Sequence, residues 1–139
     1  MTKLRIMFVA AFFLFLAAGA NAQVIVIANS GVNANSVSKA ELGRVFTGAS
    51  TRLLDGSHVT PALLKDGAVH NQFLSDYIDK SPIALIVVWR GLVLSGQGNM
   101  PKAFDSEEAM VEYVARTPGA IGYIGKATPH TGVKVLTVD

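Results

Sequence analysis

The sequence has 139 residues, of which 50% are apolar and 16% are charged, with 12 lysines and arginines against 10 acidic residues. This length suits one domain with a hydrophobic core. The absence of cysteine excludes disulfides and thiol chemistry. No run of like charges is present, so nucleic acid and anionic membrane surfaces are poor partners.

The first 22 residues have the pattern of a secretory signal peptide. A basic start precedes an apolar run from Ile6 to Ala18, and small residues at Ala20 and Ala22 predict cleavage after Ala22. The apolar run is shorter than the roughly 20 residues that span a bilayer, so we expect no membrane span in the mature form. Removal of this segment balances the charges of residues 23–139, which we expect to form one exported domain, periplasmic or secreted.

The first predicted strand covers Val24 to Ala28, a β-branched run that is too short for a helix and apolar on both faces. After a polar loop, Ser38 and Glu41 form a capping box and predict the start of a helix. A second strand is predicted from Val59 to Leu64. Pro61 within it indicates an edge strand or a bulge.

The next two helices are predicted to begin at Asp66-Gly67 and at Ser81-Pro82, where a proline in the first turn loses no helical hydrogen bond. The segment from Ile83 to Trp89 is apolar all round and fits either a strand or a helix. We favour a buried helix that continues from the Ser81 start. Trp89 and Arg90 form either a stacked pair or, as we favour, a core tryptophan beside a solvated arginine.

A fourth helix is predicted from a second capping box, Asp105 with Glu108. That helix runs into Pro118-Gly119 and stops, and the apolar stretch up to Gly125 predicts a buried strand. A glycine inside a strand usually marks the close approach of backbone or of a ligand. We therefore expect a close contact at Gly122.

A last strand is predicted from Val133 to Val138. Strands alternate with helices along the chain, which predicts an α/β fold with a largely parallel or mixed sheet. Met110 and Tyr123 are interpreted as packing residues. The histidines have no metal-ligand spacing, and no nucleophile elbow, phosphate loop or carboxylate pair suggests catalysis. We therefore expect neither an enzyme nor a metal or other cofactor.

The candidate binding residues lie at the start of the second helix. Helix N-termini bind anions through their unpaired amides and the helix dipole. The amides from Gly67 to His70, with Lys65 close by, suit such a site. The alternative is that Asp66 caps the helix and occupies these amides itself.

Three stretches are informative through their order and spacing. They read Leu-Gly-Arg-Val-Phe-Thr-Gly at 42–48, Trp-Arg-Gly-Leu-Val-Leu-Ser-Gly-Gln-Gly-Asn-Met-Pro at 89–101, and Pro-Gly-Ala-Ile-Gly-Tyr-Ile-Gly at 118–125. Together they resemble the phosphate ABC transporter substrate-binding protein family, most of all its short, single-lobe relatives. The resemblance covers about Val24 to Val138. It implies a single lobe of the type-2 periplasmic binding-protein fold, with a mixed sheet flanked by helices.

The resemblance also implies where a ligand would bind. Full-length family members close two lobes on phosphate, which they hold with a Ser-Gly-Thr turn at a helix start, an upstream arginine and an acid that accepts the proton of hydrogen phosphate. That turn falls at Gly67-Ala68-Val69, with Lys65 near the arginine and Asp66 near the acid. The serine and threonine hydroxyls of that turn are both absent here. The loss of two hydrogen bonds to the anion, worth about 1.5–3 kcal/mol each, weakens binding about 100-fold or more. His70 and Asn71 are candidate replacement donors.

Two functions follow from these observations. The first is an exported binding protein for phosphate or another oxyanion in ABC-type uptake, whose single-lobe site would need a homodimer or an envelope protein to enclose the ligand. The second is a protein-interaction module of the cell envelope that uses the lobe without a ligand. The apolar run from Ile83 to Val88 favours the second function, because a helix that is apolar all round must be buried in the core or against another chain.

Overall fold

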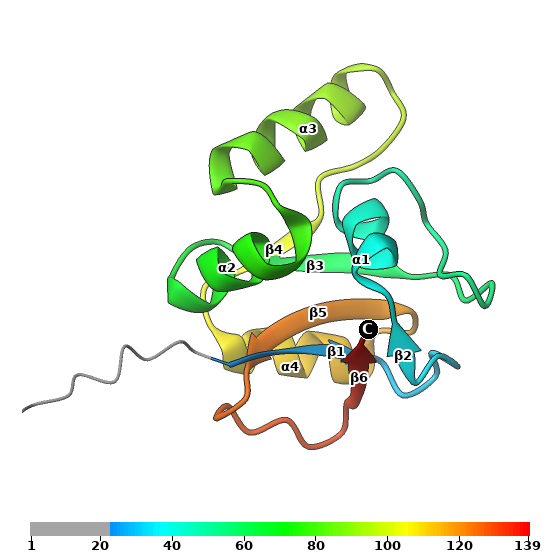
Figure 1. Cartoon of the computed structure of the whole chain (residues 1–139), viewed down its shortest axis with the longest axis vertical. Coiled ribbons are helices and arrows are strands. Elements are labelled where there is room, and N and C mark those ends of the chain that lie inside the picture. The colour runs from blue at the N-terminus through cyan, green and yellow to red at the C-terminus, as the bar shows by residue number, and fades with distance from the viewer. Residues whose placement is uncertain (1–22) are drawn as a thin grey trace, which may run out of the picture.

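A computed structural model describes residues 23–139, so the predicted signal peptide lies outside the described residues. A six-stranded mixed sheet has the strand order β2-β6-β1-β5-β3-β4 (Figure 1). Its strands are β1 (Val24–Ala28), β2 (Ser36–Val37), β3 (Thr60–Leu64), β4 (Lys102–Phe104), β5 (Ala120–Gly125) and β6 (Lys134–Val138). The helices are α1 (Lys39–Phe46), α2 (Ala68–Phe73), the π-helical η1 (Leu74–Ile78), α3 (Pro82–Leu94) and α4 (Glu107–Arg116). The predicted α/β class is confirmed. Among these helices, none is both long enough and apolar enough to cross a membrane.

Helices cover both faces of the sheet, as two neighbouring residues of β5 demonstrate. Successive residues of a strand point to opposite faces. Gly122 faces Met110 of α4, whereas the Tyr123 ring stacks on Phe73 of α2 with 3.8 Å between centroids and meets Phe46 of α1 edge-on. The sheet is therefore the middle layer, with α4 on one face and α1 and α2 on the other (Figure 1).

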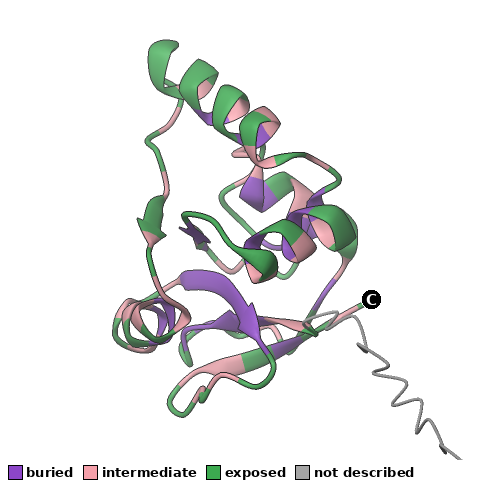
Figure 2. Cartoon of the chain, turned by 90° about the vertical axis from the view of Figure 1, so that its left-hand side faces the viewer, coloured by how far each residue is buried: buried purple, intermediate pink, exposed green. Residues whose placement is uncertain are grey.

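Strand β5 forms the centre of the core, since all of its residues are buried (Figure 2). Before it, α4 ends at the C-cap Thr117, Gly119 has a φ of 77°, and the N–H of Thr60 donates to the Gly119 carbonyl at 2.9 Å. These features confirm the predicted change from helix to strand. The close neighbour of Gly122 is a side chain and not the backbone or ligand that was expected, because a Cβ added at Gly122 would lie 2.6 Å from the Met110 sulfur.

Helix α1 begins with the predicted capping box. The Glu41 N–H donates to the Ser38 hydroxyl at 3.1 Å, and the Ser38 N–H donates to Oε2 of Glu41 at 2.7 Å. Oε1 accepts the N–H of Leu54 at 2.7 Å, a contact that the sequence did not predict. Burial by itself would raise the pKa of Glu41, but the hydrogen bonds from Ser38 and Leu54 outweigh it and lower the pKa. One carboxylate thus ties α1 to the loop that follows it.

The predicted second capping box is wrong. The N-cap of α4 is Ser106, whose hydroxyl accepts the N–H of Ala109 at 3.1 Å. Asp105 instead forms an ion pair with Lys65, at 3.1 Å. The helix start is therefore shifted by one residue from the prediction: the hydroxyl of Ser106 caps the amide three residues on, and α4 begins at Glu107.

Pro61 was predicted to mark an edge strand or a bulge, and the edge-strand alternative is wrong because the proline lies in an interior strand. Strand β3 pairs with β5 on one side and with β4 on the other. Pro61 is opposite Ile121 of β5, but pairing with β4 starts only at Ala62. The proline is therefore tolerated because it precedes the ladder with β4.

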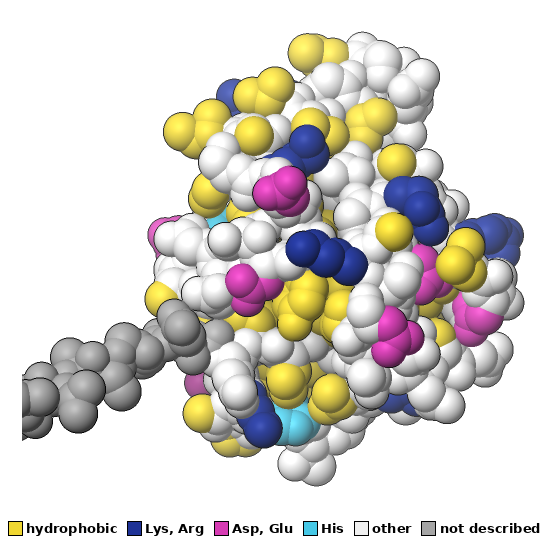
Figure 3. All heavy atoms as spheres, viewed as in Figure 1, with side chains coloured by type: hydrophobic (Ala, Val, Ile, Leu, Met, Phe, Trp, Pro, Cys, Tyr) yellow, Lys and Arg dark blue, Asp and Glu magenta, His cyan; other side chains and the backbone are white. Residues whose placement is uncertain are grey.

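Helix α3 begins as predicted, with the Ser81 hydroxyl accepting the N–H of Ala84 at 3.1 Å. It is a helix, as favoured, but it is not buried: of its 13 residues only Leu85 and Trp89 are buried. Its exposed large apolar side chains are Ile83, Ile86, Val87, Val93 and Leu94. They add to the hydrophobic atoms over the upper part of the molecule, where α3 lies (Figure 3). The expectation of a buried helix is wrong because the fold supplies packing partners to one face only.

The packed face of α3 is held by its tryptophan. Trp89 is 6% exposed, and its Nε1 donates to the carbonyl of Phe46 at 2.9 Å. Arg90 beside it is exposed. The favoured interpretation of a core tryptophan next to a solvated arginine is confirmed.

Candidate functional site

Three parallel strands end at one edge of the sheet. Strand β3 lies between β5 and β4 and runs parallel to both. Helix α2 follows β3, and α4 follows β4, so both helices begin at this edge. In open α/β sheets, ligands bind outside the carboxyl ends of the strands. This edge is therefore the candidate site.

A hollow of about 340 Å³ opens between the starts of the two helices, and Gly67, Ala68 and Val69 line it from the α2 side. Gly67 is the N-cap, with a φ of 101°, and no side chain caps the helix. Asp66 therefore does not occupy the first amides, contrary to the alternative considered for the sequence. Helix α2 continues directly into η1, so the helical run behind these amides covers residues 68–78.

The hollow is acidic. Its lining includes the carboxylates of Asp66, Asp105, Glu107 and Glu108. Oε1 of Glu107 accepts the N–H of Gly125 at 2.5 Å and the hydroxyl of Thr128 at 2.9 Å. Asp105 is neutralised by Lys65, at the surface of the molecule. Within residues 23–139, no group of three or more side chains is arranged to hold a metal ion.

His70 lies in the core behind this site. It is 4% exposed, and its Nδ1 lies 2.5 Å from the hydroxyl oxygen of Tyr123. That oxygen accepts the N–H of Leu64 at 2.9 Å, so the hydroxyl proton points to Nδ1 and the imidazole proton is assigned to Nε2. Burial lowers the pKa of His70 and outweighs the charge of Asp66, which raises it. Burial also raises the pKa of Tyr123. His70 thus holds α2 against β3 and β5.

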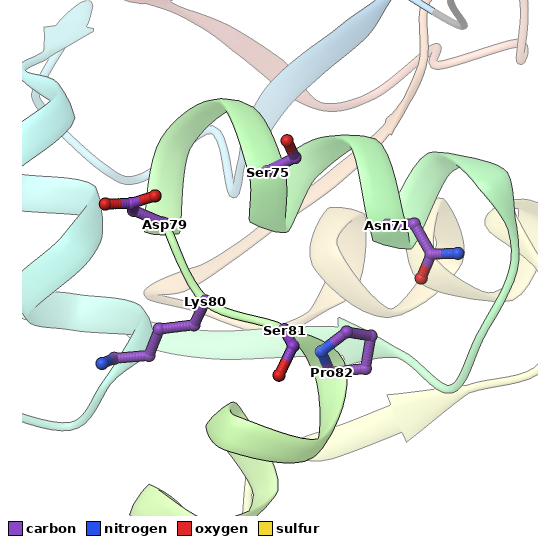
Figure 4. A pocket seen from close by; sticks show the side chains of 6 residues that line it. All are labelled: Asn71, Ser75, Asp79, Lys80, Ser81 and Pro82. Atoms are coloured by element: carbon purple, nitrogen blue, oxygen red, sulfur yellow. The ribbon is translucent and has the colours of Figure 1, made fainter.

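Asn71 lines a separate hollow of about 370 Å³, between α2 and the start of α3. Figure 4 shows the side chains of Asn71 and Asp79 pointing in opposite directions, so the polar groups of this hollow do not converge. Of the predicted residues, the structure brings Gly67, Ala68 and Val69 together, with Lys65 nearby through its ion pair. It places His70 in the core and Asn71 apart.

The α4 side of the site was missed in the sequence. Ser106, Glu107 and Glu108 line the hollow because β4 pairs with β3 and so brings the start of α4 beside that of α2. The two glutamates in the first turn were a usable sign of a helix start. The three-residue strand before them gave no periodic pattern, so nothing indicated that this helix begins at the same sheet edge.

No protein-family model matches the sequence, and no curated protein matches it either. Solved structures do match. A protein from Clostridium perfringens, described as a phosphate ABC transporter substrate-binding protein with bound phosphate, has a TM-score of 0.64 at 15% identity over 84% of this chain and 44% of its own. PstS from Borrelia burgdorferi has a TM-score of 0.61 at 15% identity, over 84% of this chain and 47% of its own. An ABC-type phosphate transport receptor from Vibrio cholerae has a TM-score of 0.55 at 12% identity, over 83% of this chain and 45% of its own.

These matches confirm the predicted fold, that of one periplasmic binding-protein lobe, and the predicted likeness to phosphate-binding proteins at the level of structure. The chain spans less than half the length of each of these structures. At such low identity the likeness establishes the fold alone.

Proposed function

We propose that the chain is an exported solute-binding protein whose ligand is phosphate or a related oxyanion, in the manner of ABC-type uptake. One observation carries the proposal. The uncapped amides at Gly67 to Val69 lie at the carboxyl ends of parallel strands, in a fold shared with a protein that holds phosphate. Helix starts of this kind bind anions through amides and dipole.

The acidic lining favours a protonated oxyanion. Asp66 and Glu108 lie around the same hollow and would repel an anion that has only acceptor oxygens. Hydrogen phosphate carries a hydroxyl that can donate to a carboxylate, whereas sulfate at neutral pH carries none. We therefore expect phosphate to bind more tightly than sulfate. Because the chain spans less than half of its structural neighbours, we propose that a second surface, from another copy or an envelope protein, completes the site.

The test is thermal unfolding of the protein in phosphate, sulfate or nitrate at constant ionic strength. A ligand at 100 times its Kd stabilises the folded state by about 2.7 kcal/mol. Phosphate should raise the melting temperature, and sulfate and nitrate should raise it less. Equal melting temperatures in all three salts, up to about 10 mM anion, would count against the proposal.

A proline at the first helical position supplies a selective variant. Ala68→Pro removes one amide that the proposal assigns to the ligand, yet proline is well tolerated at this position of a helix. It should weaken phosphate binding by about tenfold while leaving the fold intact. Ala68→Leu keeps the amide and is the matched control. Loss of phosphate binding in both variants would point to a steric effect.

A further inference from the structure

A second hollow, of about 400 Å³, lies at the other end of β3. Thr60 and Pro61 line it from the start of the strand, whereas Leu64, at the end of the strand, borders the acidic hollow beside α2. Its apolar and aromatic lining includes Val59, Pro61, Trp89, Leu92, Met100 and Tyr113. Small-ligand pockets have volumes of roughly 300–1,000 Å³ and mostly apolar walls.

Trp89 forms a fixed wall of this hollow. The hydrogen bond from its Nε1 to Phe46 holds the indole in place. Two glycines that line the hollow lie beside its six-membered ring: a Cβ added at Gly48 would be 3.1 Å from ring atoms, and one at Gly98 would be 3.8 Å from Cζ3. The Cβ at Gly48 would also lie 2.4 Å from Cδ1 of Leu92, so that side of the ring is filled by protein atoms, whereas the space beside Gly98 remains open to a ligand.

The charges of the lining select the ligand. Among the described residues that line this hollow, none is aspartate or glutamate. Lys102 supplies a positive charge, and its Nζ lies 5.4 Å from the centroid of the Tyr113 ring, which also lines the hollow. Gln97 and Asn99 add amide groups. An apolar hollow with a cation and no acid is complementary to an apolar molecule that carries one negative charge.

We propose that this hollow binds a small monocarboxylate with an apolar body, which packs on Trp89 while its carboxylate meets Lys102. The inference is independent of the oxyanion site, which lies at the opposite end of β3 and is acidic where this hollow is not.

Trp89 makes the test direct, because the chain contains one tryptophan and its ring lines this hollow. The protein is titrated with 4-methylpentanoate, with the uncharged 4-methylpentanamide, and with inorganic phosphate. The carboxylate should give a saturable change in emission, and the amide should bind about three- to tenfold more weakly. Phosphate should leave the emission unchanged. Equal binding of carboxylate and amide, or no saturable change up to about 10 mM carboxylate, would overturn the proposal.

Gly98→Leu locates the site. Gly98 does not have a positive φ, and a Cβ there lies 3.5 Å from Leu92, an ordinary contact, so a larger side chain fills the hollow without backbone strain. This variant should lose the fluorescence response to 4-methylpentanoate. Gly91→Leu, on α3 where no atom lies within 4 Å, is the matched control and should keep the response.

Lys102→Gln tests the charge at an exposed position of β4. It should reduce affinity for the carboxylate to that for the amide, with circular dichroism confirming the fold. Lys126→Gln, on another exposed lysine, should bind like the natural protein. Unchanged affinity in Gly98→Leu or in Lys102→Gln would overturn the proposal.

Discussion

The hydroxyl oxygen of Tyr123 lies 2.5 Å from Nδ1 of His70, and the same oxygen accepts the N–H of Leu64 at 2.9 Å. One buried hydroxyl thus joins β5, α2 and β3. Phe73 stacks on the tyrosine ring and adds a second contact from α2. Because His70 lies within one turn of Gly67, this junction determines where the open amides of the candidate site lie.

Tyr123→Phe should destabilise the protein although it removes a single oxygen atom. The change leaves the Leu64 N–H and Nδ1 of His70 buried without a partner, and each such group costs about 1–3 kcal/mol. We expect a loss of about 2–4 kcal/mol in the free energy of unfolding, measured by urea denaturation. Tyr113→Phe, at a partly buried ring on α4, is the control and should lose less than about 1 kcal/mol. Similar losses in the two variants would contradict a special role of the Tyr123 hydroxyl.

His70 should make stability depend on pH. Its pKa in the folded protein lies below the usual histidine value of 6.5, mainly because the side chain is buried. Between the pKa of His70 in the folded protein and that in the unfolded chain, the unfolded chain binds more protons. The contribution of His70 to the free energy of unfolding is therefore fully present above about pH 6.5 and is lost as the pH falls through the folded pKa. Urea denaturation between pH 7.5 and pH 5 should show this decline.

His70→Gln identifies the residue responsible, because glutamine can still accept the Tyr123 proton but does not titrate. The variant should have a flatter pH dependence over that range. His58→Gln, at an exposed position, should retain the natural dependence. An unchanged slope in His70→Gln would mean that another group is responsible.

The features predicted correctly from the sequence are those decided by neighbouring residues. Ser38 and Glu41 lie three residues apart and satisfy each other's amides, so their capping box is visible in the sequence. At the start of α4, Asp105 and Ser106 are both suitable N-cap residues, and the N-cap in the structure is Ser106. Asp105 instead pairs with Lys65, which is 40 residues away in the chain. Such a choice cannot be made from local pattern.

Half of the candidate site was likewise predictable from neighbouring residues, and the other half depends on contacts between distant segments. The α2 half was predicted because a strand, Asp66-Gly67 and a helix follow one another. The α4 half depends on β4, whose three residues form a strand only by pairing with Ala62 to Leu64 of β3. The burial of α3 was likewise misjudged, because an apolar sequence does not reveal which faces will find partners.

Gly122→Ala should destabilise the core through overpacking. The added Cβ would lie 2.6 Å from the Met110 sulfur and 3.4 Å from Val114, and overpacking of this kind costs about 1–3 kcal/mol. Gly43→Ala, on α1 with no atom within 4 Å, is the matched control and should stabilise the helix by about 0.5–1 kcal/mol. In a double-mutant cycle, Met110→Ala should relieve part of the cost of Gly122→Ala. Additive losses would contradict a direct clash.

The exposed face of α3 predicts that charge is tolerated there. Ile83 is 75% exposed and Val87 62%, so the double variant Ile83→Lys/Val87→Lys should change the free energy of unfolding by less than about 0.5 kcal/mol. Leu85→Ala, on the packed face of the same helix, should lose about 2–5 kcal/mol.

Light scattering on the same samples tests the alternative function of a protein-interaction module. If a second copy covers this face, the natural protein should associate and the double lysine variant should be monomeric. A loss above about 2 kcal/mol in a monomeric double variant would show that the face packs within its own chain.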